Sequence, residues 1–189
     1  MRIPGYLVFT AGVLAALGAG WIAFPHAIYT TRSQPVDFSH KAHADKAGLK
    51  CEDCHAFRDD GSYAGIPALE QCAGCHSAPM GATAAEKNFI DHYVTPNREP
   101  EWASYARQPE NVYFPHVAHV KRAQLKCERC HGQQGSTNSL RPYQQDRVSG
   151  YSRDIWGNRA AGVPGMKMDD CVACHKQHGL EHSCLDCHK

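Results

Sequence analysis

The stretch VYFPHVAHVKRAQLKCERCH, residues 112–131, places two histidines three residues apart in front of a Cys-x-x-Cys-His motif. The stretch VDFSHKAHADKAGLKCEDCH, residues 36–55, does the same at a constant offset of 76 and without a gap. We call residues 36–55 the first copy and residues 112–131 the second copy. Their agreement indicates an internal repeat. The first-copy residues that recur are Val36, Phe38, His40, Ala42, His43, Ala47, Leu49, Lys50, Cys51, Glu52, Cys54 and His55.

All ten cysteines of the chain belong to five Cys-x-x-Cys-His motifs, and none is left over for a disulfide. This is the attachment motif of c-type haem, in which the thiols add to the vinyl groups and the histidine binds the iron. Zinc sites also use Cys-x-x-Cys pairs, but they do not require a histidine after every second cysteine. We therefore expect five covalent c haems. The motifs, numbered along the chain, are Cys51, Cys54 and His55; Cys72, Cys75 and His76; Cys127, Cys130 and His131; Cys171, Cys174 and His175; and Cys184, Cys187 and His188.

Eight further histidines exceed the five distal ligands that five six-coordinate haems need. Two histidines three apart on a helix point in directions that differ by about 60°, so one pair can serve two irons. We expect one histidine of each pair to bind the haem that follows and the other to bind a neighbouring haem. The surplus leaves room for a sixth, non-covalent haem, and Met80, Met166 and Met168 are alternative ligands. The candidate distal histidines are His40, His43, His92, His116, His119, His178 and His182.

Residues 5–24, GYLVFTAGVLAALGAGWIAF, carry no charge and have about the length that a helix needs to cross a bilayer. A cleaved signal peptide is the alternative, although its apolar region usually spans only about 7–15 residues. We favour a retained anchor because Trp21 lies near the outer end of the run, as interfacial residues do. Haem attachment of this kind takes place outside the cytoplasm. The expected organisation is a cytoplasmic stub (1–4), a single transmembrane anchor (5–24), a tether (25–35) and a periplasmic pentahaem domain (36–189), at the bacterial inner membrane.

The composition predicts a thin apolar core, because Gly, Pro and polar residues are plentiful in the 189 residues. The expected fold is mostly irregular with short α-helices: a helical turn at each motif, a helix over 82–94 and strands only as short pairs. Segments 77–126 and 132–170 lack a haem motif, and we expect them to clasp a partner subunit or to wrap haem edges. The net charge of +1 gives no sign of a nucleic-acid partner.

Four segments resemble a known family: QPVDFSHKAHADKAGLKCEDCH (34–55), GIPALEQCAGCH (65–76), EPEWASYARQPENVYFPHVAHV (99–120) and MKMDDCVACHKQHG (166–179). Together they resemble the membrane-anchored multihaem cytochrome c subunit of alternative complex III and of the menaquinone reductase complex. FSHKAH and FPHVAH resemble the class III cytochromes, including the cytochrome c3 and c7 families. By that resemblance His40 would bind the first haem and His116 the third.

The resemblance implies an electron-transfer subunit of a respiratory quinone oxidoreductase, without catalytic residues of its own. In such complexes the cytochrome relays electrons between a soluble periplasmic cytochrome and two partners, a multi-span quinone-binding subunit and an iron–sulfur/molybdopterin-type subunit. Two features depart from the pattern. The menaquinone reductase subunit is generally described with six haems, whereas this chain has five motifs, and the C-terminal CLDCHK has no counterpart in the alternative complex III pattern. The direction of electron flow stays open.

Two other functions compete with this interpretation. A stand-alone membrane-anchored quinol dehydrogenase that feeds a periplasmic reductase shares the plan of anchor and haems. Those cytochromes place their first motif close after the helix, whereas here 26 residues separate Phe24 from Cys51. A multihaem reductase needs one haem with a vacant or unusual axial position. The surplus of histidines and the absence of a Cys-x-x-Cys-Lys motif argue against a reductase.

Overall fold

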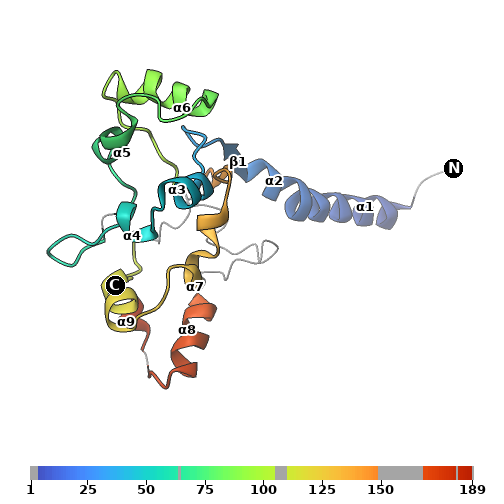
Figure 1. The fold of residues 1–189 in the computed structure, drawn as a ribbon. Coiled ribbons are helices and arrows are strands. Elements are labelled where there is room, and N and C mark those ends of the chain that lie inside the picture. Colours follow the sequence, from blue (N-terminus) through green and yellow to red (C-terminus); the bar gives the residue numbers. More distant parts are fainter. Residues whose placement is uncertain (1–3, 64, 105–109, 149–167, 182, 189) are drawn as a thin grey trace.

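The computed structural model describes residues 4–63, 65–104, 110–148, 168–181 and 183–188. A long N-terminal helix projects away from the remainder of the protein (Figure 1). It consists of α1 (Gly5–Gly18), the π-helical turn η1 (Ala19–Ala23) and α2 (Phe24–Ile28) in unbroken succession. Because Pro25 has no amide hydrogen, it cannot donate to the carbonyl of the preceding turn, and the π-helical turn precedes it.

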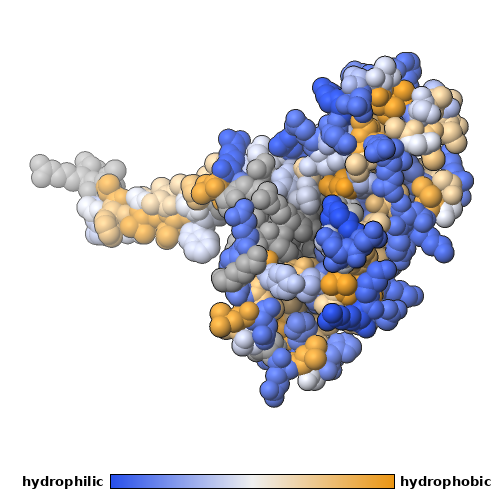
Figure 2. Space-filling view, turned by 90° about the vertical axis from the view of Figure 1, so that its left-hand side faces the viewer, coloured by the Kyte–Doolittle hydropathy of each residue, from blue (hydrophilic) through white to orange (hydrophobic). Residues whose placement is uncertain are grey.

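The N-terminal helix is long and apolar enough to cross a membrane over Gly5–Ala23, judged by length and composition. The mean hydropathy of its most apolar window is 1.8, and none of that window is buried against the protein. Figure 2 shows its apolar side chains standing clear of the more polar body. This agrees with the expected anchor over residues 5–24.

A two-stranded sheet follows the N-terminal helix directly. Strand β1 (Tyr29–Arg32) pairs antiparallel with β2 (Tyr143–Asp146), so that Tyr29 lies opposite Asp146. The stretch 25–35, expected to be a tether, thus continues the helix and then enters a sheet. Beyond the strand, the side chain of Gln34 donates to the backbone carbonyl of Ala103 at 2.9 Å and accepts from its amide at 3.1 Å.

The helices of the body are short and lie where the sequence predicts them. The helix expected over 82–94 is confirmed as α6 (Ala84–Phe89) continued by π-helical η2 (Ile90–Val94). The first histidine pair stands on α3 (His40–Ala47). In the second pair His116 immediately precedes the π-helical η3 (Val117–Arg122) and His119 lies within it. A 3₁₀ turn, η4 (Gln134–Ser136), follows the third motif. A helix occurs at every Cys-x-x-Cys-His motif: α4 (Cys51–Cys54), α5 (Leu69–His76), α7 (Glu128–His131), α8 (Met168–Gln177) and α9 (Cys184–Cys187).

The apolar core of the described residues is small, as the composition predicts. Val36, Leu69 and Phe89 form its buried cluster, and the partly buried Trp102 packs against it. The elements spread out along one direction: α5 and α6 lie at one end, α8 and α9 at the other, and α3, α4 and α7 between them (Figure 1). So small a core leaves the five motifs distributed along an open framework.

Candidate functional site

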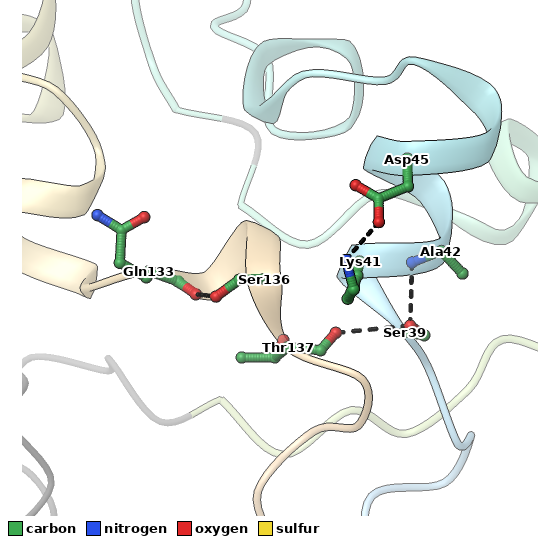
Figure 3. Close-up of polar contacts among 7 residues, drawn as sticks. All are labelled: Ser39, Lys41, Ala42, Asp45, Gln133, Ser136 and Thr137. Atoms are coloured by element: carbon green, nitrogen blue, oxygen red, sulfur yellow. Dashed lines mark hydrogen bonds and ion pairs between the residues drawn. The ribbon is translucent and has the colours of Figure 1, made fainter.

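The first copy fixes its two histidine rings against Phe38. The Phe38 ring stacks on His43 with ring centres 4.4 Å apart and meets His40 edge-on at 4.8 Å. The Nδ1 atom of His43 is hydrogen-bonded to the Ser39 carbonyl oxygen at 2.7 Å. Ser39 also begins α3, because its hydroxyl accepts the amide of Ala42 at 3.1 Å (Figure 3). A ring held on its face and at one nitrogen presents its other nitrogen, Nε2, in a defined direction.

The second copy repeats this geometry. Phe114 stacks on His119 with ring centres 4.5 Å apart and meets His116 edge-on at 4.9 Å. The Nδ1 atom of His119 is hydrogen-bonded to the Pro115 carbonyl oxygen at 3.0 Å. The sequence repeat is therefore also a structural repeat, down to the orientation of the rings.

Three histidines of the two pairs each lie near a motif histidine, which belongs to the same copy for His116 and to a later motif for His43 and His119. The rings of His43 and His76 have centres 6.0 Å apart, those of His116 and His131 are 6.4 Å apart, and those of His119 and His175 are 6.2 Å apart. The planes of the last two pairs are nearly parallel, at 3° and 15°, whereas those of the first pair are tilted by 59°. Each facing pair thus combines one proximal and one distal candidate.

These separations fit a metal ion between the rings. A metal bonded to two imidazole nitrogens at about 2 Å holds the ring centres about 6 Å apart, because each centre lies about 1 Å beyond its nitrogen. Rings in direct contact within this chain, such as Phe38 and His43, are closer, at 4.4 Å. Within the described ranges no three His, Cys, Asp or Glu side chains gather as a metal cluster. Three motif histidines therefore each have a second imidazole at about this spacing. Paired imidazoles together with paired cysteines are the residue types that hold a bis-histidine c haem.

His40 belongs to the same arrangement at the first motif. Burial lowers the pKa of His40, and the nearby charges of His55 and then His43 lower it further. His116 shows the same order of causes, with burial first and then His131 and His119. Both directions favour neutral imidazole, the form that binds a metal. The charge of the motif 1 histidine thus acts on His40 as that of the motif 3 histidine acts on His116.

The segment after the third motif packs on the first copy. The hydroxyl of Ser39 donates to the Thr137 carbonyl oxygen at 3.5 Å (Figure 3). The backbone amide of Lys41 donates to the same oxygen at 3.0 Å. The Thr137 hydroxyl lies 3.3 Å from Nδ1 of His40. Tyr63, which follows motif 1, stacks on His116 with ring centres 4.2 Å apart and lies 6.5 Å from His55. Motifs 1 and 3 are therefore neighbours in space.

The cysteines show which motifs adjoin one another. Burial is the main reason for the raised pKa of Cys51, Cys72, Cys130 and Cys171, and in each case the next cause is a thiol of another motif. Cys127 raises the pKa of Cys51 and is also hydrogen-bonded to it. Cys54 raises the pKa of Cys72, and Cys174 raises that of Cys130. Cys130 and Cys187 both raise the pKa of Cys171. None of the ten cysteines forms a disulfide. The motifs therefore adjoin in the order 2–1–3–4–5.

The second cysteine of motif 2, Cys75, differs from the first. Both stand on α5, but Cys75 is exposed, whereas Cys72 is partly buried and packs against the apolar core. Within the described ranges no contact joins the Cys75 thiol to another motif or to a facing histidine. Residues three apart on a helix differ in direction by about 60°, so Cys72 and Cys75 differ in burial although they stand on the same side of α5. The thioether bond of Cys75 stays a prediction from the motif alone.

The motif histidines have different hydrogen-bond partners at Nδ1. The Nδ1 atom of His55 meets the carbonyl oxygen of Gly65 at 2.7 Å, whereas that of His76 meets the carboxylate of Glu86 at 2.9 Å. Hydrogen bonds from the backbone amides of Met80 and Gly81, together with His76, hold the pKa of Glu86 below its usual range. Such partners orient a metal-bound histidine and set its basicity.

The other candidate ligands are not brought to a motif histidine by any contact of the described residues. His92 is exposed, and its Nδ1 meets the Asn88 carbonyl oxygen at 2.9 Å. His178 is also exposed. The nearby motif 5 histidine, His188, is held by its backbone, which pairs with that of Val112. Met80 and Met168 are 73% and 64% exposed. His182 and Met166 lie outside the described residues.

Several residues that shape the site were not singled out from the sequence. Phe38 and Phe114 recur in the repeat, so their shared position was a usable signal for a role at the histidines. Tyr63, Glu86 and Thr137 come from segments without a motif, and nothing in their local sequence indicates that they meet histidines. Only the tertiary structure places them there.

Comparison with known proteins agrees with this arrangement. Residues 22–99 match the class III cytochrome c family. The chain belongs to this family. Over 98% of its length this class III cytochrome is 34% identical to the multiheme cytochrome c subunit of menaquinone reductase from Nitratidesulfovibrio vulgaris Hildenborough, and the match covers 90% of that protein. Covalent haem c and electron transfer follow from membership, as the sequence predicts. The mostly helical and irregular fold and the N-terminal apolar helix over Gly5–Ala23 are features of the structure, and they agree with the prediction.

Proposed function

We propose that this class III cytochrome is the electron-transfer subunit of a membrane quinone oxidoreductase complex. It carries five covalent c haems and relays electrons between a soluble periplasmic cytochrome and partner subunits that handle the quinone. The observation that carries the proposal is the set of three neighbouring imidazole pairs, each joining a histidine of a repeat copy to a motif histidine, with ring centres 6.0, 6.4 and 6.2 Å apart. Axial positions closed on both sides suit one-electron transfer and leave no place for a substrate at those irons.

Each residue of the site has a role in holding a haem. The ten motif cysteines, including the exposed Cys75, form the thioether bonds, and the five motif histidines are the proximal ligands. His40, His43, His116 and His119 are the distal ligands at motifs 1, 2, 3 and 4, in that order. The distal ligand at motif 5 comes from His178, His182 or His92. When bound, the haems supply reversible one-electron chemistry, and the protein keeps each imidazole oriented and shields the iron from water.

The order of the motifs in space supports a relay. The thiols that raise one another's pKa link the motifs in the order 2, 1, 3, 4 and 5. The row runs from the end at α5 and α6 to the end at α8 and α9 (Figure 1). Motif 2 and motif 5 are therefore the two places at which electrons enter and leave the row.

The proposal includes an orientation and partners. Residues 1–4 lie in the cytoplasm, and residues 5–24 cross the bacterial inner membrane. Residues 25–35 connect this anchor to the haem domain, which residues 36–189 form in the periplasm. A multi-span quinone-binding subunit and an iron–sulfur/molybdopterin-type subunit bind this chain. Support comes from the relative, which is named as a subunit of a menaquinone reductase, and from the apolar helix over Gly5–Ala23.

Intact-mass measurement and electron paramagnetic resonance (EPR) of the purified oxidised protein test the haem content and ligation. We expect the mass of five added haems, and only low-spin iron signals. A chain with bound zinc or with fewer than five haems would contradict the proposal, and a stoichiometric high-spin signal would favour a reductase instead.

Gentle purification from the native membrane tests the partners. We expect the chain to co-purify with large membrane and iron–sulfur subunits, and quinol oxidation to require them. Since each haem adds two propionates to a chain of net charge +1, reduction by a basic soluble cytochrome should slow as salt increases. Quinol oxidation by the isolated cytochrome would identify it as a stand-alone quinol dehydrogenase.

A further inference from the structure

The carboxylate of Glu86 is the centre of a closed hydrogen-bond network at motif 2. Its Oε1 atom meets Nδ1 of His76 at 2.9 Å and accepts the amide of Met80 at 2.7 Å. Its Oε2 atom accepts the amide of Gly81 at 2.9 Å. The carboxylate side chain is only 11% exposed. Three donors on two oxygens fix the carboxylate against the motif histidine.

The local sequence does not account for this placement. Thr83 begins α6, and its hydroxyl accepts the amide of Glu86 at 3.2 Å. A glutamate three residues after such a threonine usually reaches back to the threonine amide in a capping box. Here the carboxylate instead turns to the loop at residues 80–81 and to His76 on the neighbouring helix α5. The loop also makes room for it, since a Cβ atom at Gly81 would lie 3.2 Å from Oε2.

His76 and His55 differ in the charge of the group at Nδ1. Once Nε2 of a histidine binds iron, Nδ1 carries the proton and must donate. His55 donates to a neutral backbone carbonyl, that of Gly65, whereas His76 donates to a carboxylate, which is ionised at neutral pH by its ordinary pKa. A charged acceptor draws the proton away from the ring and makes Nε2 a stronger electron donor.

We propose that Glu86 is a positioning residue that lowers the reduction potential of the haem at motif 2 through His76. A more basic imidazole and a nearby negative charge both stabilise oxidised iron relative to reduced iron. Hydrogen bonding to an axial ligand is one of the means by which proteins tune haem potentials. Because motif 2 is one end of the row, Glu86 sets the potential at an entry or exit point. This inference rests on the proposed function, which supplies the haem at motif 2.

Redox titration and EPR of the five-haem membrane protein test the inference. Glu86→Gln keeps the size of the side chain and removes its charge. We expect one of the five redox components to move to higher potential, with about a tenfold larger equilibrium constant for reduction, or about 59 mV for one electron. The low-spin signal of that component should also change. Gly81→Ala, which crowds Oε2, should move the same component in the same direction by less.

Glu70→Gln is the matched control. Glu70 lies on α5, the same helix as His76, but is exposed, so its replacement removes an equal charge near motif 2 without touching the histidine. We expect it to leave all five components in place. An equal shift in Glu70→Gln would overturn the inference, as would unchanged potentials in both Glu86→Gln and Gly81→Ala. Intact mass separates the claims: a wild-type chain short of five haems contradicts the proposed function, whereas a loaded chain insensitive to Glu86→Gln contradicts only the inference.

Discussion

In the first copy Ser39 begins the α-helix α3, whereas in the second copy Pro115 occupies the equivalent position and the histidines stand at π-helical η3. The rings are nevertheless held alike, with ring centres of phenylalanine and second histidine 4.4 Å apart in one copy and 4.5 Å in the other. In both copies the Nδ1 atom of that histidine meets the carbonyl oxygen four residues earlier. The aromatic ring and that carbonyl therefore define the module, and the type of helix does not.

The two copies also share the way in which they connect motifs. The first histidine of each copy lies beside the motif of its own copy, and the second faces the next motif along the chain: His43 faces His76, and His119 faces His175. Motif 2 begins 21 residues after Cys51, but motif 4 begins 44 residues after Cys127. The repeat is lost in sequence because the second connection is longer, while the pairing of rings is kept.

Among the variants that test this comparison, replacement of the second histidine in either copy should have the largest effect, because it changes the spin state of an iron. His43→Ala and His119→Ala should each leave one iron with a single axial ligand, so that one of the five low-spin EPR signals is replaced by a high-spin signal. The double variant should lose two of the low-spin signals. The lost signal should differ between the single variants, because His43 and His119 face different motifs.

Intact mass provides the control for these variants, since all of them should still carry five covalent haems. If His43→Ala and His119→Ala removed the same low-spin signal, or if neither produced high-spin iron, the parallel between the copies would be wrong.

Loss of the phenylalanine ring should weaken both copies equally. Phe38→Leu and Phe114→Leu each remove a stacked and an edge-on ring contact, so we expect about 1.5 kcal/mol less stability for each variant. Thermal unfolding of the haem-loaded protein measures the loss, and Phe38→Tyr and Phe114→Tyr, which keep the ring, are the matched controls. A loss confined to one copy would show that only that copy depends on its aromatic ring.

The smallest effect is expected where the helices of the two copies begin, because only the first copy has a side-chain cap there. Ser39→Ala removes the hydroxyl that caps α3 and should cost about 1 kcal/mol, or a decrease in melting temperature of about 3 °C. Pro115→Ala removes no side-chain cap, since the second copy has none. An equal loss of stability in the two variants would mean that the backbone difference between the copies has no energetic consequence.

The short elements of the fold could be predicted because their causes are local. A helical turn at each motif and the helix predicted over 82–94 follow from residue types and spacing. The pairing of β1 with β2 could not be predicted, since it joins Tyr29–Arg32 to Tyr143–Asp146 and neither strand is marked by a hydrophobic pattern. Such long-range contacts depend on the packing of the whole chain.

The residue types of the candidate site could be predicted from the sequence, but the contacts that these residues make could be predicted only in part. The repeat predicted that one histidine of each pair reaches beyond its own copy, but not which motif that histidine meets. Glu86 illustrates the reason: its local sequence fits a capping box, and only the approach of α5 to α6 turns its carboxylate toward His76. The assignment of distal ligands stays a prediction, as does the thioether bond of the exposed Cys75.

The strand β1 begins at Tyr29, immediately after the apolar helix ends at Ile28, and the Ile28 carbonyl accepts the amide of Arg147 at 2.7 Å. The antiparallel pairing of Tyr29–Arg32 with Tyr143–Asp146 continues from the end of the apolar helix without an intervening loop. The helix and the body are therefore joined by backbone hydrogen bonds rather than by a free linker, and this restricts the movement of one relative to the other.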